Sequence, residues 1–212
     1  MGSDMSIFRR RKLFGDSLPL AWYTCSQFDN RERDNMSDKS LTHIYYGNGK
    51  GKTTAALGLA LRASGQGKKV VIVQFLKEWK CGELAQLALL PNITVFRGKS
   101  SGGKFVYDMS GEEKLKTKAM HDENLMKALA LQRNGMCDLL ILDEAIDAYQ
   151  LEVLDAGLLE GLMEDKPETL ELVVTGHKPD DRLLESADYI TEMVKHRHPY
   201  DAGVAARRGV EF

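Results

Sequence analysis

A glycine-rich segment, Gly47–Thr54 (GNGKGKTT), constrains the fold of this chain more than any other feature. It lies between an apolar run that ends in Tyr45-Tyr46 and a helix-forming run, TTAALGLALRAS. In such a place the backbone N–H groups of a glycine-rich loop can point at a phosphate, at the positive end of the following helix. The segment departs by one residue from the usual G-x-x-x-x-G-K-[ST] pattern, because Tyr46 stands where the first glycine would stand. The strand-to-helix context outweighs this offset, and we predict a phosphate-binding loop.

The residue types of the loop fit a magnesium nucleoside triphosphate. Its glycines permit positive φ and a close approach of the backbone to an anion. Lys52 would place an ammonium on the outer phosphates, and Thr53 would offer a hydroxyl to a bound magnesium ion. The simpler alternative is a Gly-Lys turn that caps a helix, which three alternating glycines, two lysines and paired threonines disfavour. The predicted nucleotide-binding residues of the loop are Gly47, Asn48, Gly49, Lys50, Gly51, Lys52, Thr53 and Thr54.

Strand and helix signals alternate along the rest of the chain. A long helix is predicted from about Gly111 to Asn134, because Ser110 and Glu113 form a capping box and Asn134-Gly135 is a stop signal. This alternation predicts an α/β fold, a P-loop NTPase-like three-layer sandwich with a mostly parallel central sheet and helices on both faces. The predicted strands cover residues 41–46, 68–76, 93–97, 138–144, 170–176 and 189–194.

One of the predicted strands ends in two carboxylates. The apolar run Leu139–Leu142 is followed directly by Asp143 and Glu144. Carboxylates at the carboxyl end of a buried parallel strand would face a metal ion held beside the phosphate-binding loop. The alternative is an aspartate that caps a helix, followed by a solvated glutamate. The neighbouring loop makes the metal site the stronger hypothesis.

Composition sets limits on partners and compartment. A net charge of -2 provides no overall field to gather nucleic acid, and no apolar run is long enough to span a membrane. The three cysteines form no C-x-x-C pair, so we predict neither a disulfide scaffold nor a zinc site, and a reducing cytoplasm as the compartment.

Two regions are expected. Residues 1–39 are predicted to be a weakly ordered extension without helical or alternating pattern, and residues 40–212 a single nucleotide-binding domain. The start MGSDMS formally fits a myristoylation signal, but Met-Gly-Ser is also a common remnant of an expression vector, which we favour.

From about residue 41 to residue 212 the chain resembles the ATP:corrinoid adenosyltransferases of the CobA/BtuR/CobO type. The resemblance starts with the loop and the run that follows it, GNGKGKTTAALGLALRASGQGKKVVIVQFLK. It continues in the same order and spacing through KFVYDMSGEEK, DLLILDEAIDAY and VVTGHKPDDRLLESADYITEM. The closing segment KHRHPYDAGVAARRGVEF, combined with the offset loop, makes the resemblance specific.

The resemblance implies adenosyl transfer by the domain at residues 40–212. Cobalt(I) of a reduced corrinoid would attack the 5′ carbon of ATP, and intact triphosphate would leave with its magnesium ion. It implies Lys52, Thr53 and Glu144 as catalytic residues, with Thr53 and Glu144 on the magnesium ion. Arg62 would lie near a nucleotide phosphate or the ribose. From the residues alone, a regulatory ATPase that hydrolyses ATP to ADP remains the alternative function.

The resemblance also implies a corrinoid side to the site. Phe105 and Tyr107 occupy the place of an aromatic pair that displaces the lower axial ligand of the corrinoid, although the best-studied branch has tryptophan where this chain has Tyr107. Without the resemblance, KFVYDM is equally compatible with an edge strand whose aromatic side chains pack on the sheet. The resemblance does not decide between complete cobalamin and a cobyrinate-type precursor.

A second departure from the family lies at His177, where members often carry arginine. A permanent cation would become titratable there, or else His177 only caps the next helix and Lys178 carries the charge. The resemblance further implies an external electron donor such as a reduced flavoprotein. It also implies a homodimer in which a segment before the first strand covers the neighbouring active site.

Overall fold

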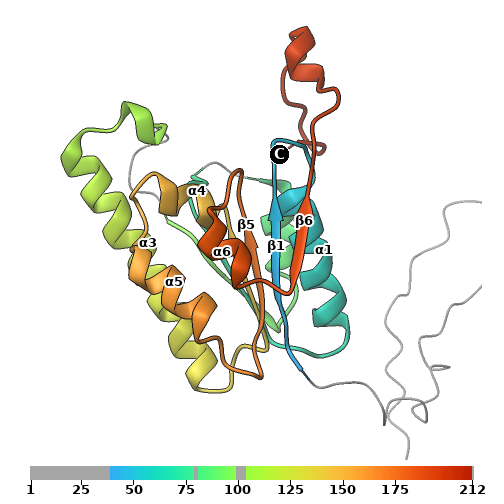
Figure 1. The fold of residues 1–212 in the computed structure, drawn as a ribbon. Helices are drawn as coiled ribbons and strands as arrows, with labels where there is room; N and C mark the ends of the chain where they lie inside the picture. Colours follow the sequence, from blue (N-terminus) through green and yellow to red (C-terminus); the bar gives the residue numbers. More distant parts are fainter. Residues whose placement is uncertain (1–38, 79–80, 99–103, 212) are drawn as a thin grey trace, which may run out of the picture. The chain divides into compact units, whose positions relative to one another are not determined.

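Six strands form one sheet in which every paired neighbour is parallel, in the order β3-β2-β4-β5-β1-β6 (Figure 1). This computed structural model describes residues 39–78, 81–98 and 104–211, so the prediction of a weakly ordered extension falls, apart from residue 39, outside the described residues. All six predicted strands are confirmed, with slightly shorter bounds. They are β1 (Thr42–Tyr46), β2 (Val70–Gln74), β3 (Ile93–Phe96), β4 (Leu139–Asp143), β5 (Glu171–Thr175) and β6 (Tyr189–Glu192).

Helices cover both faces of the sheet, which confirms the predicted three layers. Buried residues of α1 and α2 pack on one face, and those of α3, α4, α5 and α6 pack on the other. Within the described residues no helix is long and apolar enough to cross a lipid bilayer. The α-helices are α1 (Lys52–Gly65), α2 (Gly82–Leu87), α3 (Gly111–Arg133), α4 (Ala145–Gln150), α5 (Ala156–Glu164) and α6 (Asp181–Glu185).

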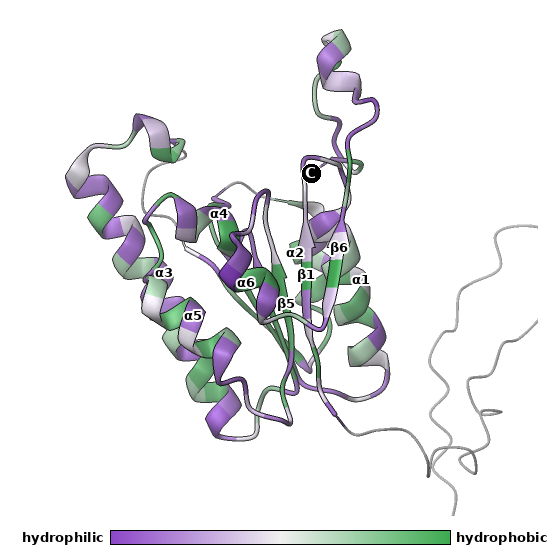
Figure 2. Cartoon of the chain, in the orientation of Figure 1, coloured by the Kyte–Doolittle hydropathy of each residue, from purple (hydrophilic) through white to green (hydrophobic). Residues whose placement is uncertain are grey.

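The central strands are apolar on both sides because each of their faces meets a helix layer. In β4, Leu139 and Ile141 join the cluster under α1, whereas Leu140 and Leu142 join the cluster under α3 and α5. All four side chains are at most 1% exposed. Hydrophobic residues accordingly gather in the strands and on the helix faces that meet them (Figure 2). The parallel pairing of these strands brings their carboxyl ends to one edge of the sheet.

The long helix α3 begins with the predicted capping box. The Ser110 hydroxyl accepts a hydrogen bond from the Glu113 amide (3.2 Å), and the Glu113 carboxylate accepts one from the Ser110 amide (2.8 Å). The Lys104 ammonium donates to the same carboxylate at 2.6 Å. These bonds lower the pKa of Glu113 to about 2, the largest contribution coming from Lys104. The segment before α3 is thereby tied to the start of the helix.

A short turn lies near the C-terminal end of the described residues. Pro199–Ala202 forms a short 3-10 helix, η4, and Gly203 follows it in the left-handed region with φ of 76°. The chain beyond η4 returns to the phosphate-binding loop, where the Lys50 ammonium donates to the carbonyl of Val210 at 3.3 Å.

Candidate active site

The loop at residues 47–54 joins β1 to α1, as predicted. Its backbone contacts the residues that follow β5 and β6, the two strands that flank β1. The Gly47 amide donates to the carbonyl of His177 (3.0 Å) and the Gly49 amide to that of Met193 (2.7 Å). Gly47 has φ of 108°, and a Cβ there would lie 2.5 Å from the Met193 carbonyl oxygen. A Cβ on Gly49 would lie 2.6 Å from the same oxygen. Only glycine fits at these two positions.

The ammonium of Lys52 lies inside the curve of the loop. It donates to the carbonyls of Gly47 (2.6 Å) and Gly49 (3.0 Å). Burial lowers the pKa of Lys52, an effect that the nearby carboxylates of Asp147 and Glu144 oppose. The loop thus holds a cation inside its curve, where it would meet an anion that approaches the start of α1.

Asp143 is fully buried and is the centre of the polar network beside the loop. Its Oδ1 accepts hydrogen bonds from the hydroxyls of Thr53 and Thr175, both at 2.9 Å. Its Oδ2 accepts from the Gln74 amide at 3.3 Å and from the Lys77 ammonium at 2.6 Å. The carboxylate therefore fixes the Thr53 hydroxyl, while Asp143 itself is 0% exposed. The alternative in which Asp143 caps a helix is wrong, because all four of these donors are side chains.

Glu144 follows in the left-handed region, with φ of 62° and ψ of 24°. Its amide donates to the Thr175 hydroxyl at 2.9 Å, which holds this uncommon backbone conformation in place. Burial raises the pKa of Glu144, and the Lys77 ammonium opposes this shift. Glu144 occupies the N-cap position of α4, yet its side chain caps nothing and instead lines the cavity described below.

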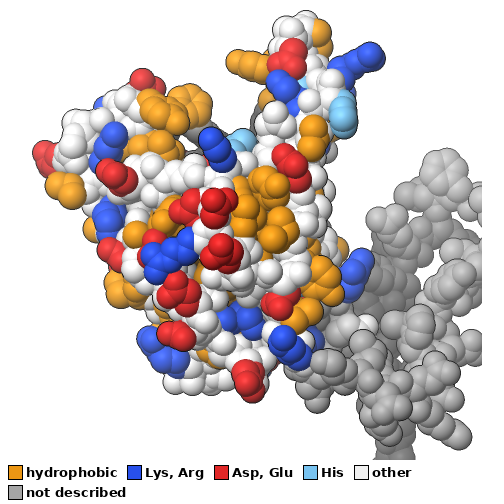
Figure 3. Space-filling view, in the orientation of Figure 1, with side chains coloured by type: hydrophobic (Ala, Val, Ile, Leu, Met, Phe, Trp, Pro, Cys, Tyr) orange, Lys and Arg blue, Asp and Glu red, His pale blue; other side chains and the backbone are white. Residues whose placement is uncertain are grey.

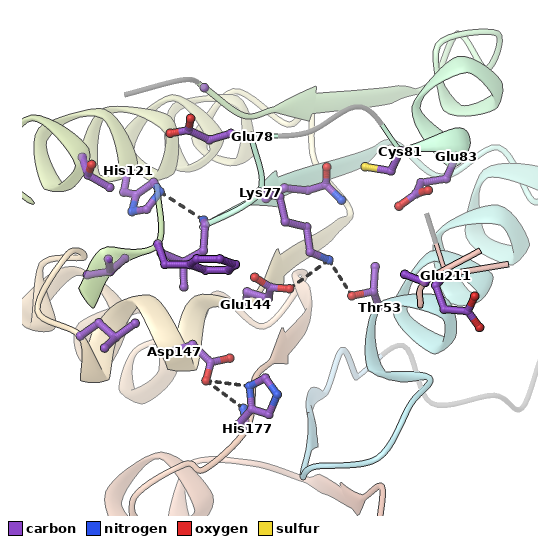
Figure 4. A pocket seen from close by; sticks show the side chains of 18 of the residues that line it. Thr53, Lys77, Glu78, Cys81, Glu83, His121, Glu144, Asp147, His177 and Glu211 are labelled. Carbon is purple, nitrogen blue, oxygen red and sulfur yellow. Dashed lines mark hydrogen bonds and ion pairs between the residues drawn. The ribbon is translucent and has the colours of Figure 1, made fainter. Parts of the chain in front are cut away.

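Lys77 is a residue of this cluster to which the sequence analysis gave no role. Its ammonium lies 2.7 Å from the Thr53 hydroxyl and 3.4 Å from Glu144 Oε1 (Figure 4). It also lies 2.6 Å from Asp143 Oδ2. Burial opposes the charge, but the carboxylates of Asp143 and Glu144 outweigh it and raise the pKa of Lys77. No local sequence signal indicated it: β2 pairs with β4 in the folded sheet, so a lysine just after β2 emerges beside the carboxylates that end β4.

This oxygen set is suitable for a divalent cation. One hydroxyl and two carboxylates surround the Lys77 ammonium, and oxygen ligands of this kind are those that Mg²⁺ prefers. Among the described residues, no group of three or more His, Cys, Asp or Glu side chains could hold a metal ion. A magnesium ion at this position would therefore need further oxygens, such as those of a bound triphosphate.

A cavity of about 1270 Å³ extends from the loop to the segment before α3. It is larger than the roughly 300–1,000 Å³ of a typical small-molecule site. Thr53, Thr54 and Glu144 line it on the loop side, and Phe105 and Tyr107 on the other. The space-filling view shows an open notch between the projecting start of α3 and the C-terminal segment (Figure 3).

The segment with the two predicted corrinoid-binding residues is not an edge strand. Val106–Asp108 forms a single 3-10 turn, η3, and only Val106 packs into the core. The side chains on either side point outward, with Phe105 67% exposed and Tyr107 83% exposed. The alternative in which these aromatics belong to an edge strand and pack on the sheet is wrong, because the segment forms a 3-10 turn and both side chains are exposed. Two large apolar side chains instead stand exposed at the cavity.

His177 also lines the cavity and is paired with a carboxylate. Its Nδ1 lies 2.9 Å from Asp147 Oδ1, and its amide donates to the same oxygen at 3.3 Å. The alternative in which His177 caps the next helix is wrong, because the Asp180 carboxylate accepts from the Leu183 amide and caps α6. The side chain of His177 is 61% exposed.

Arg62 is the predicted site residue that the structure does not bring to the loop. It lies in the last turn of α1, and its side chain is exposed. Ten residues of helix place it about 15 Å along the axis from Lys52. It is absent from the described lining of the cavity. Its charge acts instead on Tyr45: burial raises the pKa of Tyr45, and the Arg62 charge opposes this shift.

A buried histidine of α3 contributes to the cavity wall and predicts a pH dependence of stability. His121 is 2% exposed, and burial lowers its pKa below the usual 6.5, against the effects of the Val153 carbonyl and the carboxylates of Asp122 and Glu78. The unfolded chain therefore binds a proton below about pH 6.5 that the folded chain does not, and stability should fall there by about 1.4 kcal/mol per unit of pKa difference.

The measurement is the free energy of unfolding in urea at pH 7.5 and pH 5.5. His121→Gln should lose less stability between the two than the unmodified protein, and His196→Gln, at an exposed position, should lose as much. Equal losses in His121→Gln and the unmodified protein would contradict the assignment.

Fold and site together define an α/β protein with a parallel sheet and a glycine-rich loop between β1 and α1. The model of the family described as ATP:corrinoid adenosyltransferase BtuR/CobO/CobP matches residues 38–212. The chain belongs to this family.

Curated relatives agree over most of their length. A corrinoid adenosyltransferase of Escherichia coli (strain K12) is 31% identical over 185 residues, 87% of this chain and 91% of the relative. A corrinoid adenosyltransferase of Sinorhizobium sp is 31% identical over 176 residues, 82% of this chain and 81% of the relative. Corrinoid adenosyltransferase CobA of Salmonella typhimurium is 29% identical over 189 residues, 87% of this chain and 91% of the relative.

Proposed function

We propose that this enzyme transfers the 5′-deoxyadenosyl group of ATP to the cobalt(I) of a reduced corrinoid and releases triphosphate. The observation that carries the proposal is the single cavity shared by the phosphate-binding loop and the exposed aromatic pair, Phe105 and Tyr107. The cobalt(I) electron pair forms the cobalt–carbon bond, and the electrons of the C5′–O bond leave with the triphosphate. The protein therefore has to hold two substrates in line and stabilise a departing polyanion.

On the nucleotide side, we assign the triphosphate to the loop at residues 47–54 with the Lys52 ammonium. A magnesium ion would be held by Thr53 and Glu144, and when bound it would neutralise the charge of the leaving group. The buried carboxylate of Asp143 orients the Thr53 hydroxyl from behind. Contact of Arg62 with the nucleotide remains a prediction, which requires the adenosine to extend along α1.

The reaction products test the proposal. Protein incubated with ATP, magnesium and chemically reduced corrinoid should form light-sensitive adenosylcorrinoid and triphosphate in equal amounts. ADP and phosphate in their place would show instead the alternative activity, an ATPase or nucleotide-driven switch. The same incubation with complete cobalamin and with a cobyrinate-type precursor decides which corrinoid is used.

On the corrinoid side, we predict that Tyr107→Ala impairs activity by at least about tenfold when cobalt(II) must be reduced on the protein. The aromatic pair is proposed to displace the lower axial ligand and so to ease that reduction. Affinity for ATP with magnesium should change less than twofold, because Tyr107 lies across the cavity from the loop. Adenosylation from cobalt(II)alamin with a reductant, together with calorimetric titration of ATP, measures both effects.

The matched control is Leu115→Ala, which removes another exposed apolar side chain, one that is 69% exposed on α3. It should leave both measurements unchanged. Activity of Tyr107→Ala at the level of the unmodified protein would remove Tyr107 from the corrinoid site.

The remaining proposals concern the electron donor, the oligomeric state and the cellular location. We propose an external electron donor such as a reduced flavoprotein, since cobalt(I) must be regenerated for each turnover. We also propose a homodimer and a location in the cytoplasm.

A further inference from the structure

The Lys77 ammonium occupies the position in which a divalent cation would sit. It is surrounded by the Thr53 hydroxyl, Asp143 Oδ2 and Glu144 Oε1 at 2.7, 2.6 and 3.4 Å. The proposed function assigns the oxygens of Thr53 and Glu144 to magnesium, and the Asp143 carboxylate to the orientation of the Thr53 hydroxyl. An ammonium and a magnesium ion cannot share them, so the arrival of one requires the departure of the other.

The backbone around Lys77 is held on both sides. Leu76 adopts a φ of 55°, which is uncommon for a residue other than glycine. Its amide donates to Nε2 of the buried His121 (3.4 Å), whose other ring nitrogen lies 2.7 Å from the carbonyl of Val153. The Lys77 carbonyl accepts from the Arg97 guanidinium at 2.6 Å. The base of this side chain is therefore fixed, and only its four-carbon stem can move the ammonium.

The stem leads into the cavity. Lys77 lines it together with Thr53 and Glu144, and its side chain is 16% exposed there. Rotation of the stem would carry the ammonium off the carboxylates into the space that a triphosphate bound to the loop would enter. A compact, flexible ammonium is suited to such a change of partners, whereas the fork of an arginine is not.

We propose that Lys77 is a place-holding cation: it offsets part of the negative charge of Asp143 and Glu144 in the nucleotide-free enzyme and moves onto the triphosphate when nucleotide and magnesium bind. On the triphosphate it joins Lys52 in binding the leaving group. The inference rests on the proposed function for the identity of the ligand. The new element is a change of partner by the Lys77 ammonium, from protein carboxylates to a phosphate group, when nucleotide binds.

Two binding measurements without corrinoid test the inference. The first titrates nucleotide-free protein with Mn²⁺ alone and follows free Mn²⁺ by electron paramagnetic resonance. Lys77→Met should bind Mn²⁺ at least tenfold more tightly than the unmodified protein, because two carboxylates lose their resident cation. The second titrates tripolyphosphate with magnesium, for which Lys77→Met should bind at least tenfold more weakly, because a charge-assisted hydrogen bond is lost.

Controls separate the role of the charge from a loss of structure. Lys77→Arg keeps a cation beside the carboxylates and should bind Mn²⁺ as weakly as the unmodified protein. Lys116→Met removes an exposed ammonium that pairs with Glu112, and should change neither affinity. If Lys77→Met does not fold by circular dichroism, Lys77→Gln takes its place in both titrations.

The outcomes are distinct. An unchanged Mn²⁺ affinity would overturn the place-holding role, and an unchanged tripolyphosphate affinity would overturn the movement onto the leaving group. Neither titration involves adenosyl transfer, so failure of this inference is separable from failure of the proposed function, which the reaction products decide.

Discussion

Lys52→Ala is expected to weaken the binding of ATP with magnesium by on the order of 100-fold, the equivalent of about 3 kcal/mol. The ammonium already lies within the curve of the loop, held by the carbonyls of Gly47 and Gly49 at 2.6 and 3.0 Å. Its removal takes away the one cation that the loop places over the outer phosphates. Isothermal titration of ATP measures the affinity, and single-turnover adenosylation should show at least as large a loss.

Lys50→Ala is the matched control within the same loop. Its ammonium reaches away from the loop interior, to the Val210 carbonyl at 3.3 Å, so the variant should bind ATP within about tenfold of the unmodified protein. Full nucleotide affinity in Lys52→Ala would refute the assignment of the loop as the triphosphate site.

Asp143→Ala is expected to lower the free energy of unfolding by about 3–5 kcal/mol, because one partner of a buried ion pair is removed. Asp143 is 0% exposed and accepts from Thr53, Thr175, Gln74 and Lys77. Each of those donors would lose an acceptor in the interior. Urea unfolding followed by circular dichroism measures the change, which corresponds to a fall of roughly 10 °C in melting temperature.

Glu144→Gln is the control at the adjacent position and should cost less than about 1 kcal/mol. Burial raises the pKa of Glu144, and the carboxylates of Asp143 and Asp147 add to this shift. Removal of its charge therefore relieves desolvation and repulsion even as the Lys77 contact weakens. The variant should remain folded and lose adenosyl transfer. Equal destabilisation by the two substitutions would contradict the central structural role of Asp143.

Most of the fold was predictable because its signals are local. Runs of five to nine residues with strand signals predicted all six strands, and Ser110 with Glu113 predicted the start of α3. The loop was predictable for the same reason, since its glycines, lysine and threonine are adjacent in the chain. A strand that is apolar on both faces can be recognised from its own sequence, without knowledge of the strands beside it.

What the sequence could not predict depends on contacts between distant segments. Lys77 meets Asp143 only because β2 lies beside β4, a pairing that no local pattern specifies. His121 reaches the end of β2 from α3, at a separation of 45 residues. The turn at η3 was missed because KFVYDM has the composition of a strand and its outward course follows from tertiary packing.

The contacts of Gly47 and Gly49 with the ends of β5 and β6 have a consequence for the rate of nucleotide binding. Ordering a flexible residue costs about 1–2 kcal/mol of backbone entropy. Here the sheet imposes the curvature of the loop, so this entropy is lost when the chain folds and not when nucleotide arrives. The rate of nucleotide capture should accordingly be limited by diffusion into the cavity and by the exchange of cations there, and not by a search of the loop for its shape.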